Sequence, residues 1–154
     1  MINNPGNSIL YVAIGIPGSG KTTNAPHGTW SVCPDNIRAY LYGDANIQGD
    51  GKKVFFIAYN RAQRLLADGK DVYFDATNTT KYTRQLLLKK LKPYASKCVA
   101  LYFNIPIDVC KYRNAHRSRV VPEHVIDRMY NQLSLNPPTQ DEGFDEIIEI
   151  TEVE

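Results

Sequence analysis

Hydrophobic and polar residues follow one another along this chain in blocks that predict strands and helices in turn. The clearest block is the unbroken apolar run at residues 9–14, which predicts a buried strand. Apolar residues at helical spacing within residues 52–68 predict an amphipathic helix that ends at Gly69. The same patterns predict further strands at residues 29–33, 71–75, 97–103 and 146–150, and further helices at residues 37–42, 79–91, 107–117 and 122–133.

Strands that alternate with helices indicate an α/β fold with a central, mostly parallel sheet of about five strands, covered on both faces. In such a sheet, ligands gather at the carboxyl ends of the strands. Four segments are expected to meet there, namely Gly15, Asp35, Asp75 and the turn at residues 104–106.

The run at residues 9–14 leads into a glycine-rich segment that matches the phosphate-binding loop pattern G-x-x-x-x-G-K-[ST]. Glycines let successive backbone N–H groups curve around phosphate oxygens, and the following helix adds a partial positive charge. Lys21 supplies a full charge to the outer phosphates, and the Thr22 hydroxyl is a ligand for Mg²⁺. The nucleotide-binding residues are therefore expected to be Gly15, Pro17, Gly18, Ser19, Gly20, Lys21, Thr22 and Thr23. Pro26 and Gly28 are expected to stop the helix early.

Two acidic residues follow predicted strands and are candidates for chemistry beside the phosphates. Asp75 is expected to face Mg²⁺, directly or through water, although an aspartate here can also cap a helix. No glutamate follows Asp75 to orient an attacking water, whereas Asp35 on a neighbouring strand can accept a proton from an acceptor hydroxyl. Arg38 lies one helical turn beyond Asp35, where it can bind a phosphate on the acceptor. This set favours phosphoryl transfer to an alcohol over hydrolysis; the alternatives are a capping role for Asp35 and a surface role for Arg38.

The stretch between Asp108 and Glu123 contains no acid but four bases, Lys111, Arg113, Arg117 and Arg119. The spacing of Arg113 and Arg117 predicts that both lie on one helix face, where an anion between them would offset their repulsion. Arginines that close over a phosphoryl group in transfer would stabilise its charge and exclude water. The alternative is a solvated basic helix.

The composition is that of an ordinary globular protein, with 154 residues, 43% hydrophobic and 22% charged, which predicts a single domain over residues 1–154. The net charge of +2 conceals an asymmetry, because residues 141–154 carry seven of the sixteen acids and no base. The first 140 residues therefore hold 18 bases against nine acids, which suits a polyphosphate or nucleic-acid ligand. Short apolar runs and a polar start predict no membrane span and no signal peptide, and hence a cytoplasmic location. Three widely spaced cysteines and three histidines show no disulfide or metal-ligand pattern.

Taken together, these motifs resemble the kinase module of 5′-polynucleotide kinases, within the wider group of P-loop kinases. The resemblance rests on GIPGSGKTT, on Asp35 with Arg38, on DATN at residues 75–78, on RNAHRSRVVPEHVIDRMY and on PPTQDEGFDEIIEI, in that order. It implies a three-layer P-loop NTPase/kinase fold with a helical lid at about residues 107–122, and transfer of the γ-phosphoryl of ATP, with Mg²⁺, to a 5′-hydroxyl end of DNA or RNA.

The same resemblance implies individual roles. Lys21 and Thr22 would bind the β/γ-phosphates and Mg²⁺, and Asp75 would organise the metal. Asp35 would be the general base, while Arg38, Asp75 and Asn78 would serve the acceptor side. Arg113 and Arg117 would clamp the ATP phosphates, with Arg117 stabilising the transition state together with Lys21.

Two departures from the family pattern are visible in the sequence. Lys21 and Asp35 are only 14 residues apart, and Pro34 stands where the family has an arginine just before the base. The alternatives are a P-loop kinase of a small alcohol, nucleoside or metabolite, and a nucleotide-binding module without turnover.

Overall fold

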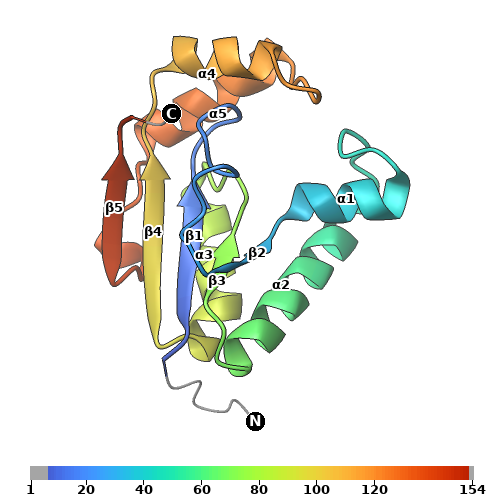
Figure 1. Cartoon of the computed structure of the whole chain (residues 1–154). Coiled ribbons are helices and arrows are strands. Elements are labelled where there is room, and N and C mark those ends of the chain that lie inside the picture. Colours follow the sequence, from blue (N-terminus) through green and yellow to red (C-terminus); the bar gives the residue numbers. More distant parts are fainter. Residues whose placement is uncertain (1–6, 153–154) are drawn as a thin grey trace.

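The computed structural model describes residues 7–152 and confirms the α/β fold, with a five-stranded sheet in the order β2-β3-β1-β4-β5 (Figure 1). All four strand pairs are parallel. The polar start at residues 1–6, expected to be no signal peptide, lies outside the described residues. The strands are β1 (Ile9–Ile14), β2 (Trp30–Val32), β3 (Val72–Phe74), β4 (Lys97–Phe103) and β5 (Glu146–Ile150).

The central strand is β1, whose apolar run predicts this position. Leu10 pairs with Val72 of β3 on one side and with Cys98 of β4 on the other. The chain leaves β1 for the β2–β3 side of the sheet and later crosses to the β4–β5 side. The carboxyl end of β1 is therefore the switch point of the sheet, where α/β proteins bind their ligands.

Five α-helices connect or follow the strands. Two of them, α2 and α3, lie along the sheet, while α4 and α5 lie beyond the carboxyl ends of the strands (Figure 1). Tyr59 of α2 stacks on Phe74 of β3 with ring centroids 5.7 Å apart, so α2 packs on the face of the sheet that carries the Phe74 side chain. The helices are α1 (Pro34–Tyr42), α2 (Gly51–Ala67), α3 (Lys81–Leu91), α4 (Ile107–Ala115) and α5 (Glu123–Leu135), with short 3₁₀ turns η1 (Lys92–Tyr94) and η2 (Gln140–Glu142).

Local sequence explains where these helices begin and end. The Asp50 side chain accepts a hydrogen bond from the Lys53 amide at the start of α2, and Thr80 caps α3 by accepting from the Thr83 amide. Gly43 ends α1 in the left-handed conformation with φ of 80°.

Within the described residues, no α-helix stands directly after the phosphate-binding loop, between the loop and β2. The helix expected at this point is reduced to a single turn. The Asn24 amide donates to the Gly20 carbonyl at 3.2 Å, and turns then continue to Thr29. Pro26 and Gly28 account for this, because proline lacks an amide hydrogen and glycine disfavours helix. These turns lie on the sheet face opposite α2, where the Tyr73 hydroxyl donates to the Lys21 carbonyl at 2.6 Å.

A buried ion pair joins the closing segment of the chain to the sheet. Arg84 of α3 is fully buried and pairs with Glu142 at 2.7 Å. The same guanidinium donates to the carbonyls of Asn78, at 3.1 Å, and Asn136, at 2.9 Å. One side chain thus fixes the loop after β3 and the segment that leads to β5.

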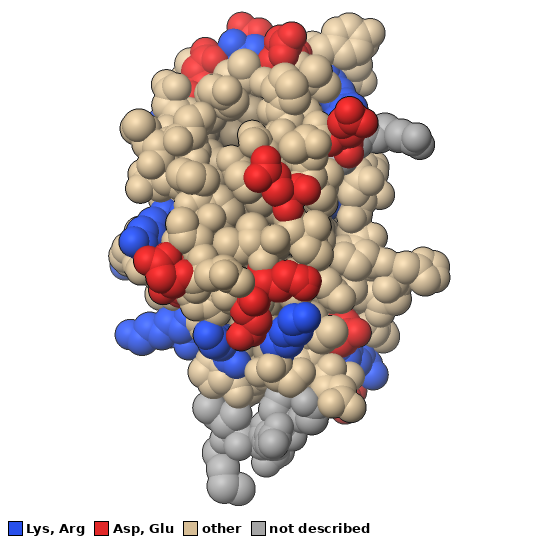
Figure 2. Space-filling view, turned by 90° about the vertical axis from the view of Figure 1, so that its left-hand side faces the viewer, with Lys and Arg blue, Asp and Glu red and all other residues tan. Residues whose placement is uncertain are grey.

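The surface around β5 carries the acidic residues expected from the sequence. Figure 2 shows this face as largely uncharged with scattered acidic side chains, while basic side chains gather toward one end. Among residues 7–152, no helix has the length and apolar character that crossing a membrane requires.

Candidate active site

The phosphate-binding loop leaves the carboxyl end of β1 and packs tightly against α4. Gly18 and Gly20 adopt φ of 83° and 95°, a region that side chains disfavour. A Cβ on Gly18 would lie 2.3 Å from the Cys110 carbonyl oxygen, so α4 approaches closely only because this residue is glycine. A Cβ on Gly15 would lie 2.6 Å from Ser19 Oγ, a buried hydroxyl with no hydrogen-bond partner among the described residues.

Lys21 is the cation of this loop, and its ammonium points back to the backbone. Its Nζ donates to the Ile16 carbonyl at 3.0 Å. The pKa of Lys21 is lowered to about 8, chiefly by burial; the charge of Asp75 opposes the shift and that of Arg117 adds to it. A partly desolvated ammonium with one backbone acceptor fits a site for anionic phosphate oxygens.

Thr22 and Asp75 form the pair that suits a metal ion. The Thr22 hydroxyl donates to Asp75 Oδ2 at 2.8 Å, and Asp75 is only 6% exposed. Thr80 caps α3, so Asp75 is not a helix cap. A hydroxyl and a carboxylate are hard oxygen donors of the kind that Mg²⁺ prefers, so these two residues would hold the ion, which would neutralise phosphate charge.

The loop after β3 forms hydrogen bonds with the end of β1 and the start of the phosphate-binding loop. The Gly15 amide donates to the Thr77 carbonyl at 3.0 Å. Asn78 adopts φ of 48°, which is unusual for a residue other than glycine. Its side-chain amide nitrogen donates to the Ala13 carbonyl at 2.8 Å. Asn78 thus holds β1; it does not line the cavity that contains Asp35, but it lines a neighbouring cavity beside α2 and α3, so its expected place on the acceptor side stays a prediction.

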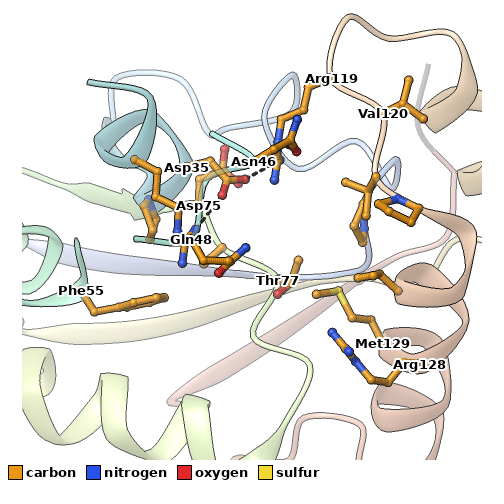
Figure 3. A pocket seen from close by; sticks show the side chains of 17 residues that line it. Asp35, Asn46, Gln48, Phe55, Asp75, Thr77, Arg119, Val120, Arg128 and Met129 are labelled. Atoms are coloured by element: carbon orange, nitrogen blue, oxygen red, sulfur yellow. Dashed lines mark hydrogen bonds and ion pairs between the residues drawn. The ribbon is translucent and has the colours of Figure 1, made fainter. Parts of the chain in front are cut away.

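Asp35 lies in the first turn of α1 and is held by two arginines. Arg38 Nη1 contacts Asp35 Oδ1 at 2.8 Å, and Arg119 Nη1 contacts Oδ2 at 2.9 Å. Arg119 Nε also donates to Asn46 Oδ1 at 3.0 Å, which joins the segment after α4 to the loop after α1 (Figure 3). A role for Asp35 as a helix cap is excluded, because Cys33 occupies the N-cap position and no side chain caps α1.

From the sequence, Arg119 was given no role of its own within the basic stretch, and Asn46 was not named. Arg119 belongs to the acid-free basic stretch, which was a usable signal, but its partner lies 84 residues away. Asn46 lies in a polar loop that carries no recognisable motif.

The arginines of the basic stretch do not share one helix face as their spacing predicts. Helix α4 ends at Ala115, after which the His116 amide donates to the Arg113 carbonyl and the chain turns. Arg113 lies in the last helical turn, and Arg117 lies beyond it. Burial and the charge of Arg119 lower the pKa of Arg117, while Asp35 acts in the opposite direction.

Some of these residues line a cavity of about 700 Å³ at the carboxyl edge of the sheet, whereas Lys21, Thr22, Arg113 and Arg117 are not part of its lining. Asp35, Asp75 and Arg119 come from three different segments and point into it (Figure 3). Pro17 brings the phosphate-binding loop to its wall, and Met129 of α5 closes the far side. The cavity therefore brings a paired carboxylate and cationic side chains together beside the phosphate-binding loop, to which Asp75 is joined through Thr22.

The fold and this site define a P-loop kinase-like α/β protein, a fold that implies nucleotide binding. A family model described as AAA domain matches residues 10–135. Since this match spans most of the chain, the protein belongs to that family.

Solved structures share the fold at low identity. A chain of the Pnkp1/Rnl/Hen1 RNA repair complex is 21% identical over 90% of this chain and 47% of its own length, with a TM-score of 0.73. Kti12 of Chaetomium thermophilum, solved with ADP-AlF3, is 15% identical over 92% and 88% of the two chains, with a TM-score of 0.68. A gluconokinase from Sinorhizobium meliloti is 19% identical over 97% and 84%, with a TM-score of 0.55. The chain spans less than half the length of the RNA repair chains that it matches.

Proposed function

We propose that this protein is a Mg²⁺- and ATP-dependent kinase of one domain that transfers the γ-phosphoryl group to a 5′-hydroxyl end of DNA or RNA. The observation that carries the proposal is the shared cavity. Asp35 lines the same space as Asp75, and Asp75 is bonded to Thr22 of the phosphate-binding loop. A proton acceptor and a phosphate site that face one space are what transfer to a hydroxyl requires.

On the donor side, the backbone of residues 15–23 and the Lys21 ammonium bind the phosphates of ATP. Lys21 leaves the Ile16 carbonyl for the phosphate oxygens, whose charge exceeds that of a backbone carbonyl. Thr22 and Asp75 hold Mg²⁺ beside them. In this arrangement the phosphates replace the contact of Lys21 with a backbone carbonyl, and Mg²⁺ held by Thr22 and Asp75 would neutralise part of their charge.

On the acceptor side, Asp35 accepts the proton of the acceptor hydroxyl as its oxygen forms a bond to the γ-phosphorus. The bond between this phosphorus and the β,γ-bridging oxygen breaks, and ADP leaves with the electron pair. Each Asp35 oxygen already accepts from one arginine, but a carboxylate oxygen has a second lone pair for the hydroxyl. Arg38 and Arg119 thus hold the carboxylate in position, and Arg38 binds the phosphate next to the acceptor hydroxyl.

Residues 107–122 act as a lid in this proposal. Arg113 and Arg117 bind the ATP phosphates when the lid closes, and Arg117 stabilises the charge of the transition state together with Lys21. The charge of Arg117 lowers the pKa of Lys21, which supports this role because the two cations must then lie close enough to interact.

The positive charge of the cavity lining supports a nucleic-acid acceptor. Three arginines, Arg38, Arg119 and Arg128, line the cavity, which suits an acceptor that carries phosphates of its own. A chain of an RNA repair complex shares the fold, but so does a gluconokinase. A kinase of a small alcohol is therefore the second candidate, favoured by the presence of such enzymes among the structural neighbours.

Incubation with γ-labelled ATP and a panel of acceptors tests the proposal. We expect label on 5′-hydroxyl oligonucleotides and not on nucleosides or sugars. Label on small molecules alone would overturn the polynucleotide acceptor, and binding of ATP without any transfer would favour a nucleotide-binding module.

Replacement of Asp35 by Asn tests the role of this carboxylate. We expect kcat to fall by about 10²–10⁴, the usual contribution of a general base, with nearly unchanged ATP affinity. Asp68→Asn, at an exposed position away from the cavity, is the matched control. Activity of Asp35→Asn near that of the control would assign the base to another residue.

A further inference from the structure

A second cavity, of about 680 Å³, adjoins the first. Both are lined by Phe55, Ala76, Thr77 and Met129, so they share a wall rather than lying apart. Figure 3 shows Phe55 and Met129 on opposite sides of Thr77, which places this wall between α2 and α5. A molecule bound near Asp35 therefore lies next to the second space.

The lining of the second cavity is aromatic and aliphatic. Phe55, Phe56 and Tyr59 come from α2, and Leu86 comes from α3. Burial raises the pKa of Tyr59 to about 12, in keeping with its contact with the Phe55 and Phe74 rings. The space resembles a site for a flat apolar group, because binding cavities of this size combine apolar walls with few polar groups.

Three threonine hydroxyls of these walls already have hydrogen-bond partners. The Thr79 hydroxyl donates to Gln132 Oε1 at 2.8 Å, and the hydroxyls of Thr80 and Thr83 lie 2.9 Å apart. A sugar would bring many hydroxyls into a space that offers them few free partners, at a cost in desolvation.

The rim of the same cavity is cationic. Lys52 of α2 and Lys90 of α3 line it and are both exposed. An apolar hollow with lysines at its edge is complementary to a nucleobase attached to a phosphodiester chain, since bases stack on aromatic side chains while phosphates contact lysine.

We propose that the second cavity binds the nucleobase of the second nucleotide of the acceptor, counted from the 5′-hydroxyl end, while the first cavity holds the terminal nucleoside. This inference rests on the proposed function and extends it, because it makes a dinucleotide the smallest good acceptor. Phe55, at the shared wall, then separates the two nucleosides.

Kinetic measurements on oligonucleotides with one abasic site test this inference. With the wild-type protein, an abasic site at the second position should raise KM about tenfold without changing kcat, as expected for the loss of one stacked base. An abasic site at the fifth position is the control and should have no effect. Phosphorylation with equal KM for both substrates would overturn the second-base site and leave the proposed function intact; no phosphorylation of any oligonucleotide would instead refute the proposed function.

Substitutions of residues that line the second cavity test whether this cavity is the site of the second base. Leu86→Trp fills it and should raise KM for the intact oligonucleotide about tenfold, while KM for the oligonucleotide abasic at position two stays unchanged. Gln85→Trp adds the same group to the same helix outside the cavity lining and is the matched control. Phe56→Ala, at a 69% exposed position, gives an independent test if the tryptophan variant does not fold. Equal effects of Leu86→Trp on both substrates would overturn the assignment.

The rim lysines supply a second readout. Lys52→Ala should reduce the salt dependence of oligonucleotide KM, whereas Lys53→Ala, whose side chain does not line the cavity, should leave it unchanged. Identical salt dependence in both variants would refute the rim contact.

Discussion

Nucleotide affinity should fall as the pH rises through the pKa of Lys21, about 8 in the nucleotide-free protein. Burial disfavours the ammonium, so this lysine begins to lose its proton well below the ordinary lysine pKa of 10.5. Bound phosphates favour the charged form and raise the pKa again. Nucleotide binding is therefore linked to proton uptake, and binding must weaken where the free protein has already lost the proton.

The size of the effect follows from the pKa. At pH 7 about nine-tenths of the protein carries the Lys21 ammonium, and at pH 9 about one-tenth does. If only the charged form binds ADP well, Kd rises about tenfold between these values, while the phosphates stay ionised throughout. At pH 8 the binding of one ADP should take up about half a proton.

Isothermal titration calorimetry with ADP at pH 7, 8 and 9, in buffers of different ionisation enthalpy, measures both quantities. Lys21→Arg is the control, because guanidinium keeps its charge over this range and should make Kd independent of pH. A wild-type Kd that stays constant from pH 7 to 9, with no proton uptake, would refute the placement of Lys21 in a desolvated phosphate site.

Three further changes have expected outcomes. Arg84→Met leaves Glu142 buried and unpaired and should cost about 3–5 kcal/mol, a fall of about 10 °C in the thermal midpoint; adding Glu142→Leu should restore most of this loss, and an unchanged midpoint for the single variant would contradict the buried pair. Gly18→Ala should weaken ADP binding in a titration far more than Gly28→Ala, since both have φ near 80° but only the first Cβ would meet the backbone of α4; equal effects would contradict the tight contact with α4. Thr22→Val should raise the Mg²⁺ concentration needed for half-maximal activity at least tenfold, and an unchanged Mg²⁺ titration would remove the hydroxyl from the metal site.

Much of the fold could be predicted because each element carries its own signal. The apolar run at residues 9–14 is long enough to identify the central strand, and residues 97–103 match β4 at both ends. After the phosphate-binding loop the motif implies a helix, but the prediction that Pro26 and Gly28 stop it early is confirmed. Pro26 and Gly28 reduce it to one turn, and local chemistry here outweighed the motif.

In the candidate site, too, the contacts that follow from local sequence could be predicted, and those that depend on the tertiary fold could not. Thr22 and Asp75 could be paired from sequence because both follow parallel strands, whose carboxyl ends share one edge of the sheet. The contact between Asp35 and Arg119 could not, since it depends on how the segment after α4 folds back over α1. Arg117 shows the limit of spacing arguments: four residues place two side chains on one face only while the helix continues, and α4 ends at Ala115.

The missing helix changes how this loop must stabilise phosphates. A helix N-terminus contributes about half a positive charge, and here a single turn replaces it. The positive charge must therefore come from side chains, namely Lys21 from the loop and Arg117 from beyond α4. Because the charge of Arg117 lowers the pKa of Lys21, these two cations repel each other when no anion is present. We expect a bound polyphosphate to relieve that repulsion, and we propose that the shortened loop and the basic segment after α4 form one anion site.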